Sequence, residues 1–153
     1  MTDYSLLCEQ LRSLADSERH WLPLLSNASA LLYDALPELN WAGFYLIEDG
    51  SLLLGPFQGK IACIRIPLGK GVCGTAAERD ETQLVPDVHA FPGHLACDGA
   101  SNAEIVVPLH RGGAVIGVLD IDSPALGRFT EADRAGLEAF ARVIEETAEW
   151  REL

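Results

Sequence analysis

Two short turn signals, each following a segment rich in strand-forming residues, constrain the fold of this chain most strongly. The first is Glu48-Asp-Gly-Ser51, after 41–47, and the second is His110-Arg-Gly-Gly113, after 104–109. Turns as short as these join antiparallel neighbours, because parallel strands need a crossover connection of about a dozen residues or more. The sequence therefore predicts a largely antiparallel sheet.

The spacing of apolar residues extends this prediction along the chain. The expected strands are 41–47, 52–55, 61–66, 82–85, 104–109 and 114–121. The expected helices are 3–15, a second from 17 or 20 to 36, a short one at 75–80, and a last one opened by the capping box Thr130-Glu-Ala-Asp133. Segment 88–102 shows no periodicity and is expected to be an irregular loop. We expect one α+β domain, 1–153, in which N- and C-terminal helices flank a central, largely antiparallel sheet of about six strands.

Composition and charge exclude several classes of protein. Of the 153 residues, 48% are hydrophobic and 22% charged, which is typical of a packed globular domain. The net charge of −12 argues against nucleic acid as a partner, because phosphate binding needs clustered Lys and Arg. The early residues include acids and lack the apolar core of a secretory signal, and no apolar run approaches the length of a membrane span. We expect a cytoplasmic protein without membrane association.

The strongest chemical signal is a set of four cysteines: Cys8, Cys63, Cys73 and Cys97. In a reducing compartment, cysteines favour catalytic, redox or metal chemistry over permanent disulfides. Helical spacing predicts that Cys8 is a small buried packing residue, and strand alternation alone would place Cys63 in the core as well. Cys73 precedes a short helix and lies close to Lys70, and both features favour the thiolate form. Cys97 lies in the irregular loop, where packing explains a thiol least.

The residues alone leave the use of these thiols open. A nucleophilic thiol, with a resolving thiol that traps its sulfenic acid, would explain three cysteines in one small domain. Three unrelated, incidental cysteines fit the composition about as well. Zinc bound by His94 and Cys97, with Cys63 or Cys73, is disfavoured because the chain has no Cys-x-x-Cys pair. We therefore expect no metal.

Acidic and aromatic residues form a second candidate group. Asp120 and Asp122 are two residues apart, so a continuous strand would place them on one face. Like charges there raise a carboxyl pKa, and such a pair, with Glu104 at the start of its own strand, could deliver a proton or bind a ligand amine. Trp41 and Tyr45 could frame an apolar slot. The alternatives are solvent-exposed carboxylates at strand ends and ordinary core aromatics.

Most of the chain resembles the free methionine-(R)-sulfoxide reductases, a family of the GAF-domain superfamily. The similarity rests on motifs spread from residue 40 to residue 129, and the cysteines at 63, 73 and 97 stand 10 and 24 residues apart, as in that family. The motifs are Asn40-Trp-Ala-Gly-Phe-Tyr45, Gly55-Pro-Phe-Gln-Gly59, Arg65-Ile-Pro-Leu-Gly-Lys-Gly-Val-Cys-Gly-Thr75, Phe91-Pro-Gly-His-Leu-Ala-Cys97, Ser101-Asn-Ala-Glu104, Gly117-Val-Leu-Asp-Ile-Asp122 and Leu126-Gly-Arg-Phe129.

The resemblance implies a GAF-like fold and a thiol-dependent reductase that acts on the free amino acid methionine-(R)-sulfoxide in antioxidant repair. It implies that Cys97 is the nucleophile and Cys63 the main resolving thiol, with Cys73 able to form an alternative disulfide. Thioredoxin would then restore the thiols, without a metal or organic cofactor, and a homodimer is implied as well.

The resemblance also assigns the second group of residues. Glu104, Asp120 and Asp122 would supply the acid and bind the substrate, and Trp41 and Tyr45 would form the wall around its methyl group and chain. Which carboxylate donates the proton stays open. The alternative function is a non-catalytic GAF module that binds a small ligand or senses redox state.

Overall fold

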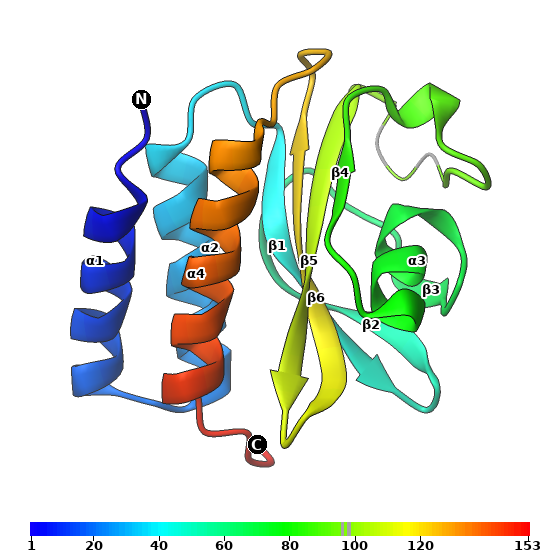
Figure 1. The fold of residues 1–153 in the computed structure, drawn as a ribbon. Coiled ribbons are helices and arrows are strands. Elements are labelled where there is room, and N and C mark those ends of the chain that lie inside the picture. The colour runs from blue at the N-terminus through cyan, green and yellow to red at the C-terminus, as the bar shows by residue number, and fades with distance from the viewer. Residues whose placement is uncertain (96, 98) are drawn as a thin grey trace.

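The computed structural model describes residues 1–95, 97 and 99–153, and its centre is a six-stranded sheet (Figure 1). The strands are β1 (Trp41–Glu48), β2 (Ser51–Gly59), β3 (Arg65–Pro67), β4 (Gln83–Val85), β5 (Ala103–Arg111) and β6 (Ala114–Ser123). They lie in the order β3-β2-β1-β6-β5-β4, and every neighbouring pair is antiparallel. The expected α+β class and antiparallel sheet are confirmed.

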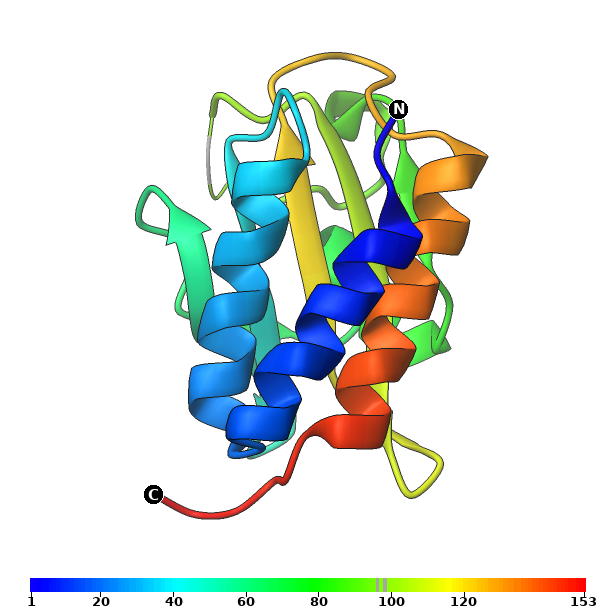
Figure 2. The same ribbon diagram turned by 90° about the vertical axis from the view of Figure 1, so that its left-hand side faces the viewer.

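Helices cover the two faces of the sheet unequally (Figure 1). One face carries α2 (Trp21–Ala35) and α4 (Glu131–Thr147), and α1 (Tyr4–Ser17) packs across both of them on the outside (Figure 2). On the other face, the described residues form two helices, α3 (Gly71–Arg79) and the short 3-10 helix η1 (Val88–Ala90). None of the helices among the described residues combines the length and apolar character needed to cross a bilayer.

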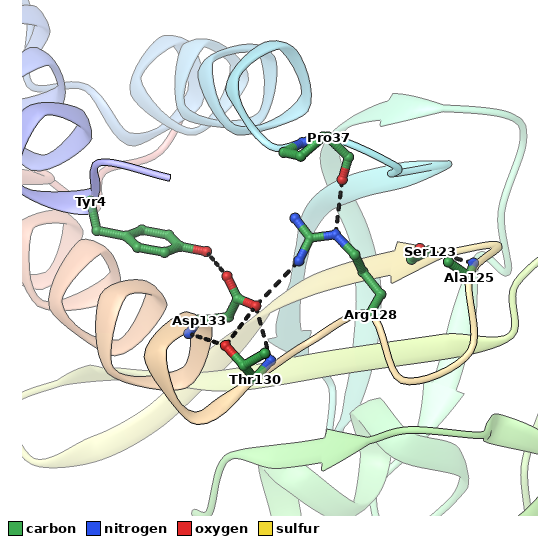
Figure 3. A network of polar contacts seen from close by, with 7 residues as sticks. All are labelled: Tyr4, Pro37, Ser123, Ala125, Arg128, Thr130 and Asp133. Carbon is green, nitrogen blue, oxygen red and sulfur yellow. Dashed lines mark hydrogen bonds and ion pairs between the residues drawn. The ribbon is translucent and has the colours of Figure 1, made fainter. Parts of the chain in front are cut away.

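A buried carboxylate joins the N-terminal helix to the C-terminal one (Figure 3). The Tyr4 hydroxyl donates to Asp133 Oδ1 at 2.7 Å, and the Thr130 backbone N–H and Arg128 Nη1 donate to Oδ2 at 2.9 and 3.2 Å. The Asp133 N–H donates back to Thr130 Oγ1 at 3.3 Å, which completes the capping box expected at the start of α4. Burial raises the pKa of Asp133, but these hydrogen bonds and the Arg128 charge outweigh it and hold the pKa below its ordinary value.

The strand expected at 61–66 is wrong in its extent. Of this segment and its neighbours, Arg65–Pro67 pairs with β2 as strand β3. Just before it, the Ile64 carbonyl accepts one more hydrogen bond, from the Leu54 N–H at 2.9 Å. Beyond Leu54, β2 carries a bulge, where its register with β1 shifts between Gly43 and Tyr45, and Pro56 in this bulge has no N–H to donate. Cys63 consequently lies in a loop, not in the sheet core.

The short helix expected at 75–80 begins earlier, at Gly71, so that Cys73 lies in its first turn. The glycines that suggest a loop serve a packing need here. A Cβ at Gly74 would lie 2.4 Å from the Pro67 carbonyl oxygen, so only glycine allows the helix to approach β3 this closely.

Candidate active site

A pocket of about 520 Å³, including its mouth, opens on the face of the sheet that carries α3. It brings together seven of the eight residues expected to form the site: Trp41, Tyr45, Cys73, Cys97, Glu104, Asp120 and Asp122. The eighth, Cys63, does not line the pocket but reaches it through a disulfide bond to Cys97. Ser101, which the sequence did not single out, also lines the pocket, and its hydroxyl accepts a hydrogen bond from Asn40 Nδ2 at 3.0 Å.

Strand register explains why distant acids meet here. Asp122 of β6 lies directly between Glu104 of β5 and Trp41 of β1. Asp120 is two residues away along β6 and lines the same pocket, so the expectation that both aspartates share a face is confirmed. Directly opposed carboxyl groups destabilise a sheet when both are charged, which favours protonation of at least one.

Glu104 and Asp120 are almost fully buried, at 8% and 5% exposure. Burial, together with the charges of Asp120 and Asp122, raises the pKa of Glu104 well above its ordinary value. Burial also raises the pKa of Asp120, although hydrogen bonds with Glu104 and Cys73 oppose the shift. Asp120 Oδ1 has no hydrogen-bond partner among the described residues. The raised pKa values favour the protonated form of these acids, beside a carboxyl oxygen that makes no hydrogen bond within the described part of the chain.

Cys73 differs from the expectation of a thiolate. Its Sγ lies 3.8 Å from Glu104 Oε2, toward which the thiol donates, and the side chain is buried. Burial and the neighbouring carboxyl groups raise the pKa of Cys73 well above its ordinary value. The helix N-terminus and Lys70 favour thiolate, but Lys70 is exposed and the acids face the sulfur directly. The expectation from sequence is wrong because it could not include partners from other strands.

The disulfide joins two residues that are 34 positions apart, with Cα atoms 5.3 Å apart. Strand β1 holds the loop that carries Cys63: the Tyr45 hydroxyl donates to the Cys63 carbonyl at 3.0 Å, and Trp41 Nε1 donates to the Lys60 carbonyl at 3.2 Å. The same two aromatic rings stack at 5.8 Å and line the pocket. The aromatic wall therefore positions the disulfide as well as shaping the pocket.

The fourth cysteine, Cys8, is unconnected with this site. It lies on α1, is half-buried against the core on the opposite side of the sheet, and burial raises its pKa. This placement agrees with a packing role.

One group of described residues offers three metal-ligand atoms within 4.8 Å: Cys73, Glu104 and Asp120. It is not the His94 and Cys97 arrangement weighed from the sequence, in which Cys97 is committed to the disulfide. The raised pKa values of all three groups favour their protonated forms, which bind metals poorly.

Known proteins are similar to this chain in both sequence and fold. The GAF domain family matches residues 25–147. Free methionine-R-sulfoxide reductase of Escherichia coli is 55% identical over 142 residues, which cover 93% of this chain and 86% of that protein. The enzyme of the same name from Saccharomyces cerevisiae is 50% identical over 139 residues, covering 86% of this chain and 77% of the yeast protein.

A solved structure of fRMsr of Staphylococcus aureus in complex with substrate superposes with a TM-score of 0.92, at 52% identity over 97% of both chains. Sequence identity above one half over nearly the whole length, with the same fold, is enough to assign the family. The chain belongs to the GAF-domain family of free methionine-R-sulfoxide reductases.

Proposed function

We propose that this chain reduces free methionine-(R)-sulfoxide to methionine, using Cys97 as nucleophile and Cys63 as resolving thiol. The observation that carries the proposal is the disulfide that links Cys63 to Cys97 beside a pocket of buried carboxyl groups with raised pKa values. The similar proteins described above bear the name of this activity.

The acids explain how a sulfoxide could react. Thiolate attack on sulfur becomes possible when the sulfoxide oxygen receives a proton, and a carboxyl group of raised pKa holds one at neutral pH. Either Glu104 or Asp120 fits this role, since both are buried and have raised pKa values. The oxygen then passes to the Cys97 sulfur as the sulfoxide S–O bond breaks, which releases methionine and leaves Cys97 as sulfenic acid.

The second step uses the other thiol. The Cys63 sulfur attacks the sulfenic sulfur of Cys97, a disulfide forms, and water leaves with the oxygen. The two thiols thus supply both electrons, and the proposal needs no metal or organic cofactor. Disulfide exchange with reduced thioredoxin would regenerate the enzyme, a reaction that suits a cytoplasmic protein.

The same pocket gives a reason for selecting a free amino acid. A carboxylate there can bind an ammonium group by a charge-assisted hydrogen bond, and an internal residue of a polypeptide has no α-ammonium group. Asp122 is the best placed for this, because it is less buried than Glu104 and Asp120. Trp41 and Tyr45 would hold the methyl group and side chain of the substrate.

The test is to incubate the protein with dithiothreitol and a mixture of the two methionine sulfoxide epimers. We expect selective loss of the R epimer and equal gain of methionine, measured by chiral chromatography. In single turnovers without added reductant, Cys97→Ser should be inactive and Cys63→Ser should complete one turnover, with Cys8→Ser as the matched control. Tight binding of methionine without loss of either epimer would contradict the proposal and favour a ligand-binding GAF module.

A further inference from the structure

Three exposed aliphatic side chains lie next to the redox disulfide. Ile61 and Ile64 flank Cys63 and are 91% and 69% exposed, and Leu95, two residues before Cys97, is 39% exposed. Elsewhere among the described residues, exposed large hydrophobic side chains lie at the chain ends, on α1 and α2, or at Leu126. Ile61 and Leu95 also line the pocket, whereas Ile64 does not, so the apolar side chains extend from the pocket to the surface outside it. Exposed apolar groups of this kind mark ligand-binding grooves and protein-binding surfaces.

The charge around this group differs from that of the whole chain. The protein has 23 acidic residues, yet none lies between residues 51 and 77. The only two lysines of the chain, Lys60 and Lys70, fall in this segment, and both are exposed. Lys60 immediately precedes Ile61, and Lys70 lines the mouth of the pocket. The segment that carries Cys63 is therefore apolar and basic, on a protein of net charge −12.

We propose that Ile61, Ile64 and Leu95, with Lys60 and Lys70, form the docking surface for a dithiol protein of the thioredoxin class that reduces Cys63. The surface calls for a partner whose reactive thiol lies in an apolar patch bordered by carboxylates. This inference rests on the proposed recycling by disulfide exchange and adds where, and at which sulfur, it takes place.

The geometry distinguishes the two sulfurs. Cys97 lines the substrate pocket, whereas Cys63 does not and lies between the two exposed isoleucines. The partner thiolate therefore attacks Cys63 Sγ, forms a mixed disulfide with it, and breaks the bond to Cys97. The second thiol of the partner then attacks its own mixed-disulfide sulfur and releases Cys63. Two electrons and two protons pass to the enzyme, and the first step leaves Cys97 as thiolate in the pocket.

The experiment uses reduced thioredoxin as the probe and measures the second-order rate constant with which it reduces the oxidised protein. Free thiols that appear during the reaction are trapped by rapid alkylation and counted. The test variant is Ile64→Gln, because Ile64 does not line the pocket and a neutral replacement leaves the attack of small thiolates unchanged. We expect about a tenfold slower reaction with thioredoxin and an unchanged rate with dithiothreitol. Leu126→Gln, at a position 65% exposed, is the matched control and should leave both rates unchanged.

Two further measurements complete the test. Lys60→Gln should slow reduction by thioredoxin about threefold at low salt, with a smaller effect at high salt. A thioredoxin variant without its second thiol should be trapped on Cys63, as peptide mass analysis would show.

The outcomes separate this inference from the function on which it rests. If thioredoxin fails to reduce the unmodified protein while dithiothreitol succeeds, recycling by thioredoxin is wrong and the surface has no partner of this class. If thioredoxin reduces the unmodified protein and Ile64→Gln equally fast, the docking surface alone is wrong. Trapping on Cys97 would overturn the assigned direction of attack.

Discussion

Two buried carboxyl groups, Asp120 and Asp133, lie on opposite sides of the sheet and have pKa values shifted in opposite directions. Their exposures are nearly equal, at 5% and 7%, but the pKa of Asp120 is raised and that of Asp133 is lowered. Asp133 receives hydrogen bonds on both oxygens and lies beside Arg128, whereas Asp120 has acidic neighbours and one oxygen without a partner among the described residues.

The difference shows that burial alone does not decide the direction in which a carboxyl pKa is shifted, because the neighbouring groups also act on it. A carboxylate whose oxygens are all satisfied serves as a structural tie, and its charge is stabilised by its donors. A carboxyl group buried among other acids retains its proton and keeps an oxygen available for a ligand. The first arrangement predicts that substitution affects stability, and the second predicts that it affects activity.

The largest effect is expected on the active-site side of this comparison. Replacing both acids, as Glu104→Gln with Asp120→Asn, removes every candidate for the buried proton donor. We expect the single-turnover rate of sulfoxide reduction at pH 7 to fall by about 100-fold or more, while the free energy of unfolding stays the same or rises. The two single variants then assign the donor. A double variant that retains full activity would show that the buried acids are not needed for the reaction.

The matching substitution on the helical side is Asp133→Ala. It leaves Arg128 and the donors of Tyr4 and Thr130 without their acceptor, so we expect a loss of about 3 kcal/mol in the free energy of unfolding, measured with urea. The reductase activity of the folded fraction should stay unchanged. Loss of activity without loss of stability would contradict the contrast between the two sites.

A smaller change tests the contribution of one hydrogen bond. Tyr4→Phe keeps the ring that packs against α4 but removes the hydroxyl that donates to Asp133 at 2.7 Å. We expect a loss of about 1 kcal/mol in the free energy of unfolding. In the Asp133→Ala background the same substitution should cost clearly less, because the acceptor is already missing. Equal costs in both backgrounds would show that the hydrogen bond contributes nothing.

The smallest expected effect concerns the free energy of unfolding as a function of pH, to which the two carboxyl sites contribute slopes of opposite sign. The folded pKa of Asp133 lies below its unfolded value near 4, so its contribution is present above that pH and is lost as the pH falls through the folded pKa. The folded pKa values of Glu104 and Asp120 lie above 4, so they reduce stability as the pH rises from 4 toward those values.

Urea titrations from pH 3 to pH 9 would measure both slopes. Asp133→Ala should flatten the slope below about pH 4 only, and Glu104→Gln with Asp120→Asn the slope above about pH 4 only. If either variant flattened the other side instead, the carboxyl group it replaces would have a pKa shifted in the opposite direction.

The sequence predicts those parts of the fold that depend on neighbours along the chain. The hairpin turns at 48–51 and 110–113, and the capping box at Thr130, are local signals, and the structure confirms them. The loop position of Cys63 could not be predicted, because it depends on where the pairing with β2 ends, beside the bulge and Pro56 of that partner strand.

The same distinction between local and long-range interactions applies to the residues of the site. Alternation along one strand was enough to place Asp120 and Asp122 on a shared face. The raised pKa of Cys73 depends on its burial and on Asp120 and Glu104, 47 and 31 residues further along the chain, and the lowered pKa of Asp133 depends on Tyr4, 129 residues away. Interactions at such separations arise only once the sheet and helices have packed, so short segments of sequence cannot predict them.

The alternation of β5 and β6 also limits how this protein can change in length. Ile105 and Ile121 of these strands are core residues beneath the helices, while Glu104 and Asp120 face the pocket. Deleting one residue from either strand would turn a carboxyl group toward the helices and an isoleucine toward the substrate.

Insertions and deletions should therefore be tolerated only at hairpin tips such as Gly112-Gly113, where a side chain would meet open space. A peptide tag for labelling or immobilisation belongs at that tip, and altered substrate preference should be sought by replacing residues and not by changing strand length.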